Sequence, residues 1–403
     1  MIQYFNDSLY KNTFFIVLTR MFNEACGFFF WMAAAKIYSV EDVGIAVALI
    51  SVQGLLILLS RLGFDVTLIR FYPLNEKMRV LSSVLIITTA STFLIVVFYF
   101  ILFYQNSEGV LIQNKSYMII FLFATLANSI STIIGTAFVS DRKGNLYFYQ
   151  NILMGLRIPL LFPLAFLGSL GIFSSVGISF AIASIFSLGI MLRREFSLGF
   201  RMDNRFLRDS FRFTFWSYLS NLLQTAPTFL LPIIVLNLLG EVETGKYYIA
   251  FMIGSLGMVI PTALGTSLFV EGSHGENLKR NAIKAAKTSI YMLFPPMAFL
   301  FFFGKFILGL LRPEYIDAIG LVRIIILSNF LGVLYVIFIP IQKVRMRVKS
   351  TAMLNGIRFI FILLLSYILI PNYGIVGVGY AWTGTYLIVV GVMLVVARRD
   401  GWF

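Results

Sequence analysis

Residues 80–103 read VLSSVLIITTASTFLIVVFYFILF, an apolar stretch of 24 residues without a single charged side chain. An α-helix rises about 1.5 Å per residue, so about 20 such residues cross the ~30 Å hydrocarbon core of a bilayer. The stretch is therefore predicted to be a transmembrane helix.

Stretches of this kind recur along the whole chain. Of its 403 residues 59% are hydrophobic and 12% are charged, and the mean hydropathy is +0.89. Twelve spans are predicted, at residues 13–37, 43–59, 80–103, 117–139, 146–167, 176–192, 213–236, 245–269, 290–308, 319–341, 352–370 and 376–397. The sequence thus indicates an all-α integral membrane protein with about 12 transmembrane helices.

The basic residues mark the topology of the chain. The net charge is +14, and most of the Lys and Arg residues fall in alternate loops or at the C-terminus. The positive-inside rule then places both termini and the loop between the halves in the cytoplasm, in a protein of the inner membrane. This distribution accounts for the charge without nucleic acid as a partner, and attraction to anionic membrane lipids is a secondary effect.

The chain has the pattern of an internal duplication. Arg157, in Gly155-Leu156-Arg157, and Arg358, in Gly356-Ile357-Arg358, are 201 residues apart, as are Gly44 and Gly245. A third, weaker match pairs Gly171-Ile172 with Gly374-Ile375. We therefore predict a six-helix lobe at 1–192, a basic cytoplasmic linker at 193–212 and a second six-helix lobe at 213–403, as parallel repeats. The linker is either an amphipathic helix on the membrane surface or a solvated basic segment.

Apart from Lys36, Lys246 and Lys305 near span ends, five charged residues fall within the predicted spans, namely Arg20, Glu24, Arg157, Arg323 and Arg358. Arg20 and Glu24 are four residues apart on one helix face, where they can form a structural ion pair. Alternatively, Glu24 is a coupling site for Na⁺ or H⁺ that Arg20 tunes. Arg323, near the outer end of its span, is the weaker candidate for substrate binding.

Arg157 and Arg358 are the main candidates for substrate binding. Each is predicted to lie roughly 14–16 Å from the cytoplasmic end of its span, near the midplane, where a charge is costly unless it faces a cavity. They could cap backbone carbonyls of a kinked neighbouring helix. We favour a water-filled cavity, because a guanidinium offers a two-pronged donor that suits phosphate.

Other residue types narrow the function. Cys26 and His274 are the only cysteine and histidine, so neither a disulfide within the chain nor a metal site built from several such ligands is expected. The chain has no motif for ATP hydrolysis or nucleophilic catalysis, so it is expected to be no enzyme and to need no cofactor. Trp31, Trp216 and Trp382 lie towards span ends, which is typical of aromatic belts at the membrane interface.

Several motifs in order resemble one family. These are Glu41-Asp42-Val43-Gly44, Leu62-Gly63-Phe64-Asp65-Val66-Thr67-Leu68-Ile69-Arg70-Phe71, Glu243-Thr244-Gly245-Lys246-Tyr247-Tyr248 and Pro371-Asn372-Tyr373-Gly374-Ile375-Val376-Gly377-Val378-Gly379. The set is similar to the Wzx-type O-antigen flippases of the multidrug/oligosaccharidyl-lipid/polysaccharide (MOP) superfamily. The resemblance implies a MATE-like fold, alternating access, and transfer of a polyprenyl-diphosphate-linked oligosaccharide to the outer leaflet. Arg157 and Arg358, with Arg20 in support, would then hold the diphosphate, and other polysaccharide-assembly membrane proteins would be partners.

Two other functions stay open at this point. A MATE-type drug antiporter has the same fold, but its cationic substrates favour buried acids, and the spans hold four arginines against one glutamate. A membrane enzyme that acts on lipid-linked sugars typically has large outer loops. The longest predicted outer loop here, around residues 105–116, has about a dozen residues.

Overall fold

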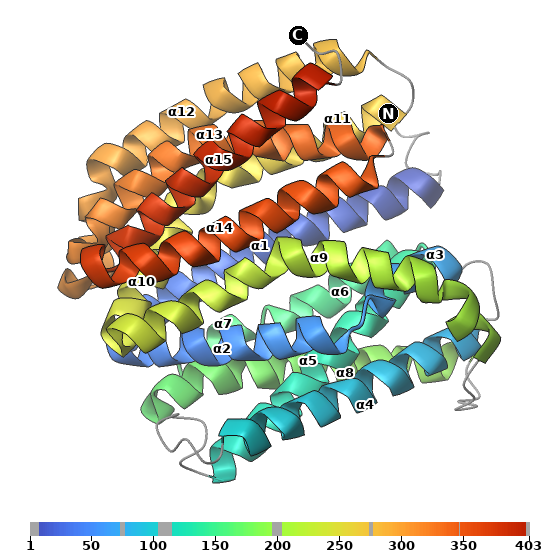
Figure 1. Cartoon of the computed structure of the whole chain (residues 1–403). Helices are drawn as coiled ribbons and strands as arrows, with labels where there is room; N and C mark the ends of the chain where they lie inside the picture. The colour runs from blue at the N-terminus through green and yellow to red at the C-terminus, as the bar shows by residue number, and fades with distance from the viewer. Residues whose placement is uncertain are drawn as a thin grey trace. The chain divides into compact units, whose positions relative to one another are not determined.

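The computed structural model describes residues 8–72, 77–103, 115–195, 204–273, 277–345 and 347–399, and these are helical without any strand (Figure 1). The first group of helices comprises α1 (Ser8–Ile37), α2 (Val40–Ser60), α3 (Phe64–Phe71), α4 (Lys77–Phe103), α5 (Lys115–Ser140), α6 (Gly144–Met154), α7 (Arg157–Leu160), η3 (Ala165–Leu167) and α8 (Ser169–Glu195). The second comprises α9 (Asn204–Leu239), α10 (Glu241–Ser255), η4 (Leu256–Met258), α11 (Val259–Ser273), α12 (Leu278–Leu311), η5 (Pro313–Ala318), α13 (Ile319–Val344), α14 (Val348–Tyr373) and α15 (Val376–Arg399).

The predicted all-α membrane class is confirmed. Within the described residues, 11 helices are long and apolar enough to cross a membrane. The predicted fifth span, 146–167, is not among them, because the chain there divides into α6, α7 and η3. The predicted fifth span is therefore a broken helix, and Arg157 is the first residue of α7, after the break.

The chain divides into two compact units. Unit 1 comprises Met1–Ser39 and Leu49–Leu222, and unit 2 comprises Val40–Ala48 and Leu223–Phe403. Two helices, α2 and α9, therefore contribute residues to both units. Of the predicted linker, residues 196–203 lie outside the described residues and 204–212 form the start of α9. The predicted lobe boundaries stay a prediction.

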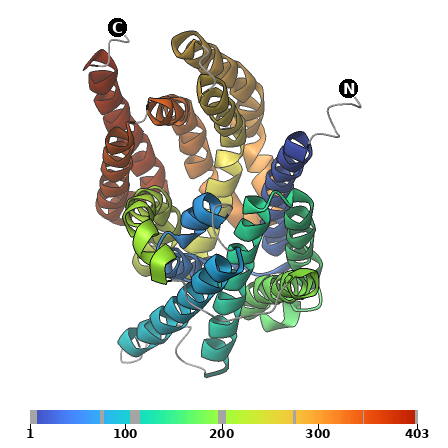
Figure 2. The ribbon, with the colours of Figure 1, turned by 90° about the vertical axis from the view of Figure 1, so that its right-hand side faces the viewer.

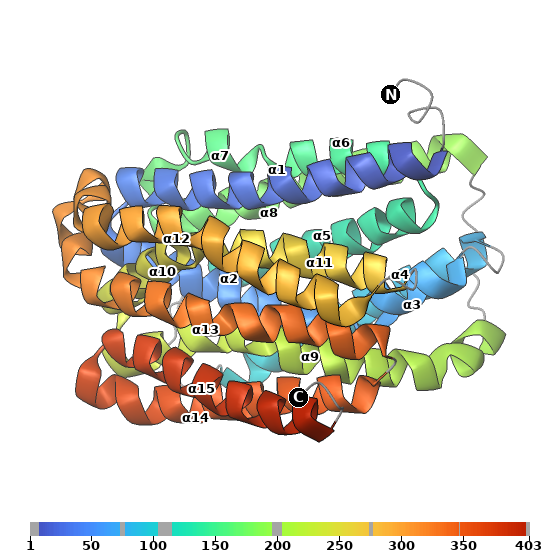
Figure 3. The ribbon, with the colours of Figure 1, turned by 90° about the horizontal axis from the view of Figure 1, so that it is seen from above.

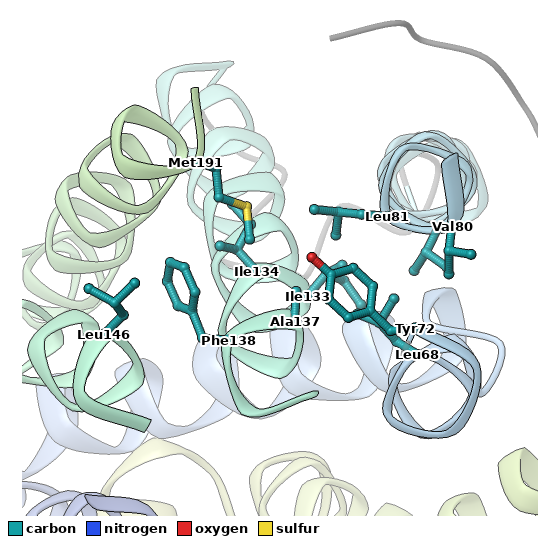
Figure 4. Close-up of a cluster of buried hydrophobic side chains, with 11 residues drawn as sticks. Leu68, Tyr72, Val80, Leu81, Ile133, Ile134, Ala137, Phe138, Leu146 and Met191 are labelled. Atoms are coloured by element: carbon teal, nitrogen blue, oxygen red, sulfur yellow. The ribbon is translucent and has the colours of Figure 1, made fainter. Parts of the chain in front are cut away.

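Helix α5 is the centre of unit 1, since α3, α4, α6 and α8 all pack against it. Near the end of α5 a cluster of buried side chains joins these helices (Figure 4). Ile133, Ile134 and Phe138 of α5 belong to this cluster, together with Leu68 of α3, Leu146 of α6 and Met191 of α8. These contacts hold the start of α6, which begins at Gly144, 13 residues before Arg157.

Helix α13 has the corresponding place in unit 2, where α10, α11, α12, α14 and α15 pack against it. Helices α14 and α15 run side by side, as Figures 1 and 3 show. Figure 2 views the helices more nearly from their ends, with those of unit 2 after α9 in yellow to red. The central helices α5 and α13 occupy matching places in the helix order, as an internal duplication requires.

The positions at which helices begin match between the two halves and correct one of the predicted residue pairs. Helices α2 and α10 begin at Val40 and Glu241, and α4 and α12 begin at Lys77 and Leu278, in both cases 201 residues apart. The proposed pairing of Gly171 with Gly374 is wrong. Gly168 and Gly374 share a positive φ, and the N–H groups of Gly171 and Gly377 donate to their carbonyls, so Gly171 corresponds to Gly377. The stretch before the last helix is therefore longer in the second repeat than in the first. In the second repeat this stretch is the continuous helix α14, and in the first it is α6, α7 and η3.

The second pair of matching residues, Gly44 and Gly245, lies at a close helix crossing inside unit 2. A Cβ atom on Gly44 would lie 1.8 Å from the carbonyl oxygen of Glu241, and one on Gly245 would lie 2.3 Å from that of Val40. Each glycine thus faces the carbonyl four residues before the other, so the contact is reciprocal. Only glycine allows backbones to approach so closely.

The segment from Leu62 to Thr67, part of a motif behind the family resemblance, packs against α9 within unit 1. Gly63 has φ +82°, and a Cβ there would lie 2.6 Å from the carbonyl oxygen of Thr214. The hydroxyls of Thr67 and Thr214 are 2.7 Å apart. The motif therefore builds a turn that binds the first half of α9.

We predict that Gly44→Ala lowers the thermal stability of the purified protein, because the new methyl group forces the α2–α10 crossing apart. Overpacking of this kind costs about 1–3 kcal/mol. The measurement is the melting temperature in detergent. Gly391→Ala is the matched control, because no atom lies within 4 Å of a Cβ at Gly391, and its melting temperature should be unchanged or raised. Equal effects of the two substitutions would contradict the crossing.

The connection between α5 and α6 is held by an acidic residue. Lys77 Nζ donates to Asp141 Oδ1 at 2.6 Å, and Lys143 forms an ion pair with the other carboxylate oxygen. Burial alone would raise the pKa of Asp141, but the hydrogen bonds and charges of Lys143 and Lys77 outweigh burial and lower it. The carboxylate therefore contributes stability above the pKa of the unfolded chain, near 3.9, and loses it as the pH falls through the lower folded-state pKa.

We accordingly expect Asp141→Asn to lower the melting temperature at pH 7, with the difference from the wild-type protein shrinking below about pH 4. Glu314→Gln, at an exposed site in η5, controls for the removal of one carboxylate. A pH-independent difference would mean that Asp141 acts through its shape rather than its charge.

Candidate functional site

The site in unit 1 begins with the break between α6 and α7. Pro159 lacks an N–H, and its ring clashes with the carbonyl of the residue four positions earlier, Gly155. The backbone switches to shorter-range hydrogen bonds, with Leu156 N donating to Leu153 O at 3.1 Å and Ile158 N to Gly155 O at 3.1 Å. The Tyr38 hydroxyl donates to the carbonyl of Leu161 at 2.7 Å and so satisfies a backbone group beyond the break.

Arg157 extends from this break towards α1. Its guanidinium lies 5.3 Å from the centre of the Phe30 ring, a cation–π contact with a fully buried aromatic side chain. A Cβ atom at Gly27 would meet nothing nearer than Arg157 Nη2, at 3.8 Å. The small residue on α1 thus leaves room for the guanidinium.

A cavity of about 170 Å³ lies beside Arg157, within unit 1. Its lining residues are Asn23, Cys26, Asn151, Met154, Gly155, Arg157 and Phe180. The amide of Asn23 donates to Asn151 Oδ1 at 2.8 Å, which joins α1 to α6. Among these lining residues Arg157 carries the only charge, and no carboxylate is present. The cavity is therefore suited to an anion and not to a cation.

Arg358 has a different environment in unit 2. It lies on the continuous helix α14, with its guanidinium 5.4 Å from the ring centre of Tyr335 and 5.6 Å from that of Trp382. Arg358 Nη1 donates to the Tyr335 hydroxyl over a long 3.5 Å, and this hydroxyl donates to Asn355 Oδ1 at 2.6 Å. Both rings are buried. Aromatic side chains from α13 and α15 thus hold Arg358 in place.

Arg20 and Glu24 are both exposed on α1. The ion pairs found within the described residues do not include one between these two side chains. Neither residue lines the Arg157 cavity. The predicted structural pair is therefore not formed here, and the assignment of Glu24 to ion coupling stays a prediction.

Arg323, near the start of α13, is exposed and contacts α12. Its Nε donates to the carbonyl of Phe301 at 3.4 Å, and its guanidinium lies 5.3 Å from the centre of the Phe301 ring. Arg323 thus shows the carbonyl capping that is the alternative interpretation of Arg157 and Arg358. Arg323 therefore contacts a neighbouring helix of unit 2, and its assignment to substrate binding stays a prediction.

The described residues contain no group of three or more His, Cys, Asp or Glu side chains that could hold a metal ion. His274 lies outside the described residues, and so do residues 104–114, which hold most of the predicted longest outer loop.

A sequence profile of the polysaccharide biosynthesis protein family matches residues 9–269, more than half of the chain. The chain belongs to this family. The Wzx-type resemblance derived from the motifs is thereby confirmed at the level of the family. No curated protein sequence matches the chain.

Solved structures identify the fold of this polysaccharide biosynthesis family member. An inward-facing MATE-family multidrug resistance transporter of the MOP superfamily matches with a TM-score of 0.75 and 15% identity, over 94% of each chain. The lipid II flippase MurJ matches with a TM-score of 0.73 and 16% identity, over 95% of this chain and 87% of its own. A MOP superfamily transporter from Pyrococcus furiosus, described by the reverse polarity of its binding pocket, matches with a TM-score of 0.56 and 15% identity, over 96% and 92%. At these identities the matches show a MATE-like fold.

Several side chains around the two arginines of this family member were not predicted from its sequence. Asn23, Cys26 and Phe30 are spaced three and four residues apart and so share one face of α1, and the polar Asn23 on an apolar helix was the available signal. Asn355 lies one turn before Arg358. The aromatic-belt interpretation is wrong for Trp31 and Trp382, which are both 7% exposed. The side chain of Trp216 lies outside the described residues.

Proposed function

We propose that the protein is a flippase that carries a polyprenyl-diphosphate-linked oligosaccharide from the inner to the outer leaflet of the cytoplasmic membrane, for the assembly of a cell-surface polysaccharide such as O-antigen. The observation that carries this proposal is the cavity beside Arg157, at a broken helix of a polysaccharide biosynthesis family member. Arginine is the only charged side chain that lines it. A diphosphate is the anionic part of such a substrate, and a guanidinium binds it through two parallel hydrogen bonds.

Broken helices support a transport role. Transporters place substrate sites near the bilayer midplane where helices are discontinuous, because unwound backbone is tolerated there only when it lines a cavity or is buried. The spacing of Arg157 along its predicted span places it near this depth. Alternating access would then move the diphosphate across while the polyprenyl tail stays in the lipid.

Both termini of the protein are proposed to lie in the cytoplasm, because the distribution of basic residues favours this orientation in the membrane. Glu24 is the proposed site for Na⁺ or H⁺, and other membrane proteins of polysaccharide assembly are proposed partners. The alternative, a MATE-type drug antiporter, is supported by the fold but not by the cavity, because an organic cation would be repelled by Arg157.

We expect Arg157→Gln to slow leaflet exchange of a fluorescent polyprenyl-diphosphate oligosaccharide in proteoliposomes by about tenfold to a hundredfold. This matches the roughly 1.5–3 kcal/mol of a hydrogen bond to a charged group. Arg358→Gln and the double variant test the second arginine. Arg398→Gln, at an exposed position at the end of α15, removes one positive charge as a control and should leave the rate unchanged.

Unchanged exchange in a folded double variant would refute the role of both arginines. No exchange of any lipid-linked sugar by the wild-type protein, together with efflux of organic cations, would establish the drug antiporter instead.

A second measurement addresses coupling. If Glu24 is the ion site, Glu24→Gln should remove the dependence of exchange on a proton or sodium gradient and leave the exchange without a gradient intact. Glu314→Gln is the control for loss of one exposed carboxylate. A gradient dependence that survives in Glu24→Gln would exclude Glu24 as the coupling site.

A further inference from the structure

Helix α12 is longer than a membrane crossing requires. Its 34 residues give it a length of about 50 Å, whereas the hydrocarbon core of a bilayer is ~30 Å thick. The apolar span predicted within this helix begins at residue 290. The first part of α12, residues 278–289, therefore extends beyond the hydrocarbon into the headgroup region.

Positive charge is concentrated on this first part of α12. Lys279, Arg280, Lys284 and Lys287 are all exposed, and α12 contains no acidic residue. The ion pairs found among the described residues involve none of these four side chains. Like charges three or four residues apart on a helix repel one another, so the approach of an anion stabilises this part of α12.

The basic residues share one side of α12 with exposed apolar side chains. Lys287, Ile290 and Phe294 follow one another at spacings of three and four residues, which places them along the same side of the helix. Tyr291, one turn after Lys287, is 76% exposed, and Phe294 is 62% exposed. This side of α12 thus presents positive charge next to an apolar strip, as the phosphate and the acyl chains of a phospholipid require.

The other side of α12 packs within unit 2. Ala282, Ser289 and Leu293 are buried there, and the main neighbours of α12 are α11 and α13. Figure 1 shows α12 at the edge of these helices. Within unit 2 the apolar strip is therefore free to contact lipid.

Two consecutive prolines add a polar feature to the strip. Pro295 and Pro296 have no N–H, so the carbonyls of Tyr291 and Met292 cannot receive the usual helical hydrogen bond. Both Tyr291 and Met292 are exposed, just inside the predicted span. A backbone carbonyl next to lipid needs a donor from elsewhere, and a headgroup that carries hydroxyls can supply one.

The matching helix of the first repeat lacks this basic face. Helices α4 and α12 begin 201 residues apart, so Lys284 and Lys287 correspond to Ser83 and Ile86. Ser83 is fully buried, whereas Lys284 is exposed. The basic face is therefore a property of α12 and not a general requirement of this position in the fold.

We infer that the exposed side of α12 from Arg280 to Phe294 is a binding site for an anionic phospholipid of the leaflet at this end of the helix. Lys284 and Lys287 hold the phosphate, and the acyl chains lie along Ile290 and Phe294. The inference is independent of the substrate that the protein transports.

A fluorescent probe on this side of α12 can measure which lipid lies against it. Phe294→Cys in a Cys26→Ser background gives a single thiol for bimane, because Cys26 is the only cysteine of the chain. The labelled protein is placed in nanodiscs of phosphatidylcholine that contain either brominated phosphatidylglycerol or brominated phosphatidylcholine. Quenching by bromine as a function of the brominated fraction gives the preference for the anionic lipid at this position.

We expect phosphatidylglycerol to be favoured about fivefold or more at Phe294, and the preference to fall to near one in Lys284→Gln/Lys287→Gln. Each basic residue close to an anionic headgroup is worth about a fivefold factor. Lys284→Arg/Lys287→Arg keeps the charge and should keep the preference. Arg398→Gln/Arg399→Gln removes two exposed positive charges at the end of α15 and should change nothing.

The first repeat supplies a matched position for the probe. Phe93 of α4 lies 201 residues before Phe294 and is also exposed, so Phe93→Cys reports on lipid at the same place in the other half. Bimane at Phe93 should show a preference near one. No preference at Phe294, an equal preference at Phe93, or a preference that survives in Lys284→Gln/Lys287→Gln would refute the site. Equal melting temperatures of the variants in neutral detergent confirm that they are folded.

A soluble headgroup separates a lipid site from a site for a free anion. Glycerol 3-phosphate has the charge of the lipid headgroup but no acyl chains to lie along the apolar strip. At matched ionic strength it should leave the preference for phosphatidylglycerol at Phe294 unchanged. Loss of the preference would mean that the phosphate alone is recognised, and would overturn the inference of a phospholipid site.

Discussion

In hydrocarbon every backbone N–H and C=O must find a partner within the protein, and this constraint shapes the whole chain. Continuous helices meet it by themselves. Where a helix is interrupted, side chains from other helices take over. The Tyr38 hydroxyl donates to the carbonyl of Leu161 after the break at Arg157, and Asn329 of α13 donates to the carbonyl of Gly254 at 2.8 Å, next to η4. Each break is thus supported from outside its own helix, and the break before Arg157 lies next to a cavity.

The same environment explains why glycine carries so much of the packing. Between helices in lipid there is little hydrophobic driving force, so close van der Waals contact has to replace it. The reciprocal approach of Gly44 and Gly245 uses backbone atoms of both helices, and the turn at Gly63 lets α9 pack against the end of α2. These positions are also those at which the chain resembles its family. The glycine motifs of the family therefore reflect contacts between helices, and they do not identify the substrate.

Hydropathy was sufficient to predict the helices, because a span long enough for the bilayer and free of charge has few other possible structures. It could not locate the break in the fifth span. Pro159 and Pro163 indicated a kink, but whether a proline kinks or interrupts a helix depends on partners such as Tyr38, more than 120 residues away. The neighbours of Arg157 and Arg358 were missed for a similar reason, since the rotation of α1, α13 and α15 about their axes is decided by packing.

Duplication explains the order of the helices but not the chemistry of the two arginines. After duplication each copy keeps the packing that holds its helices together, as the matched starts of α4 and α12 show. Placing a charged side chain inside the membrane costs free energy in both copies, so each arginine needs favourable contacts that offset this cost. In unit 2 the rings of Tyr335 and Trp382 form cation–π contacts with the guanidinium of Arg358. In unit 1 Arg157 contacts the ring of Phe30 and lines a cavity beside the helix break. A pair of residues at one repeat offset is therefore evidence of common descent of the two halves, and the helix break in the first half is what distinguishes the surroundings of Arg157 from those of Arg358.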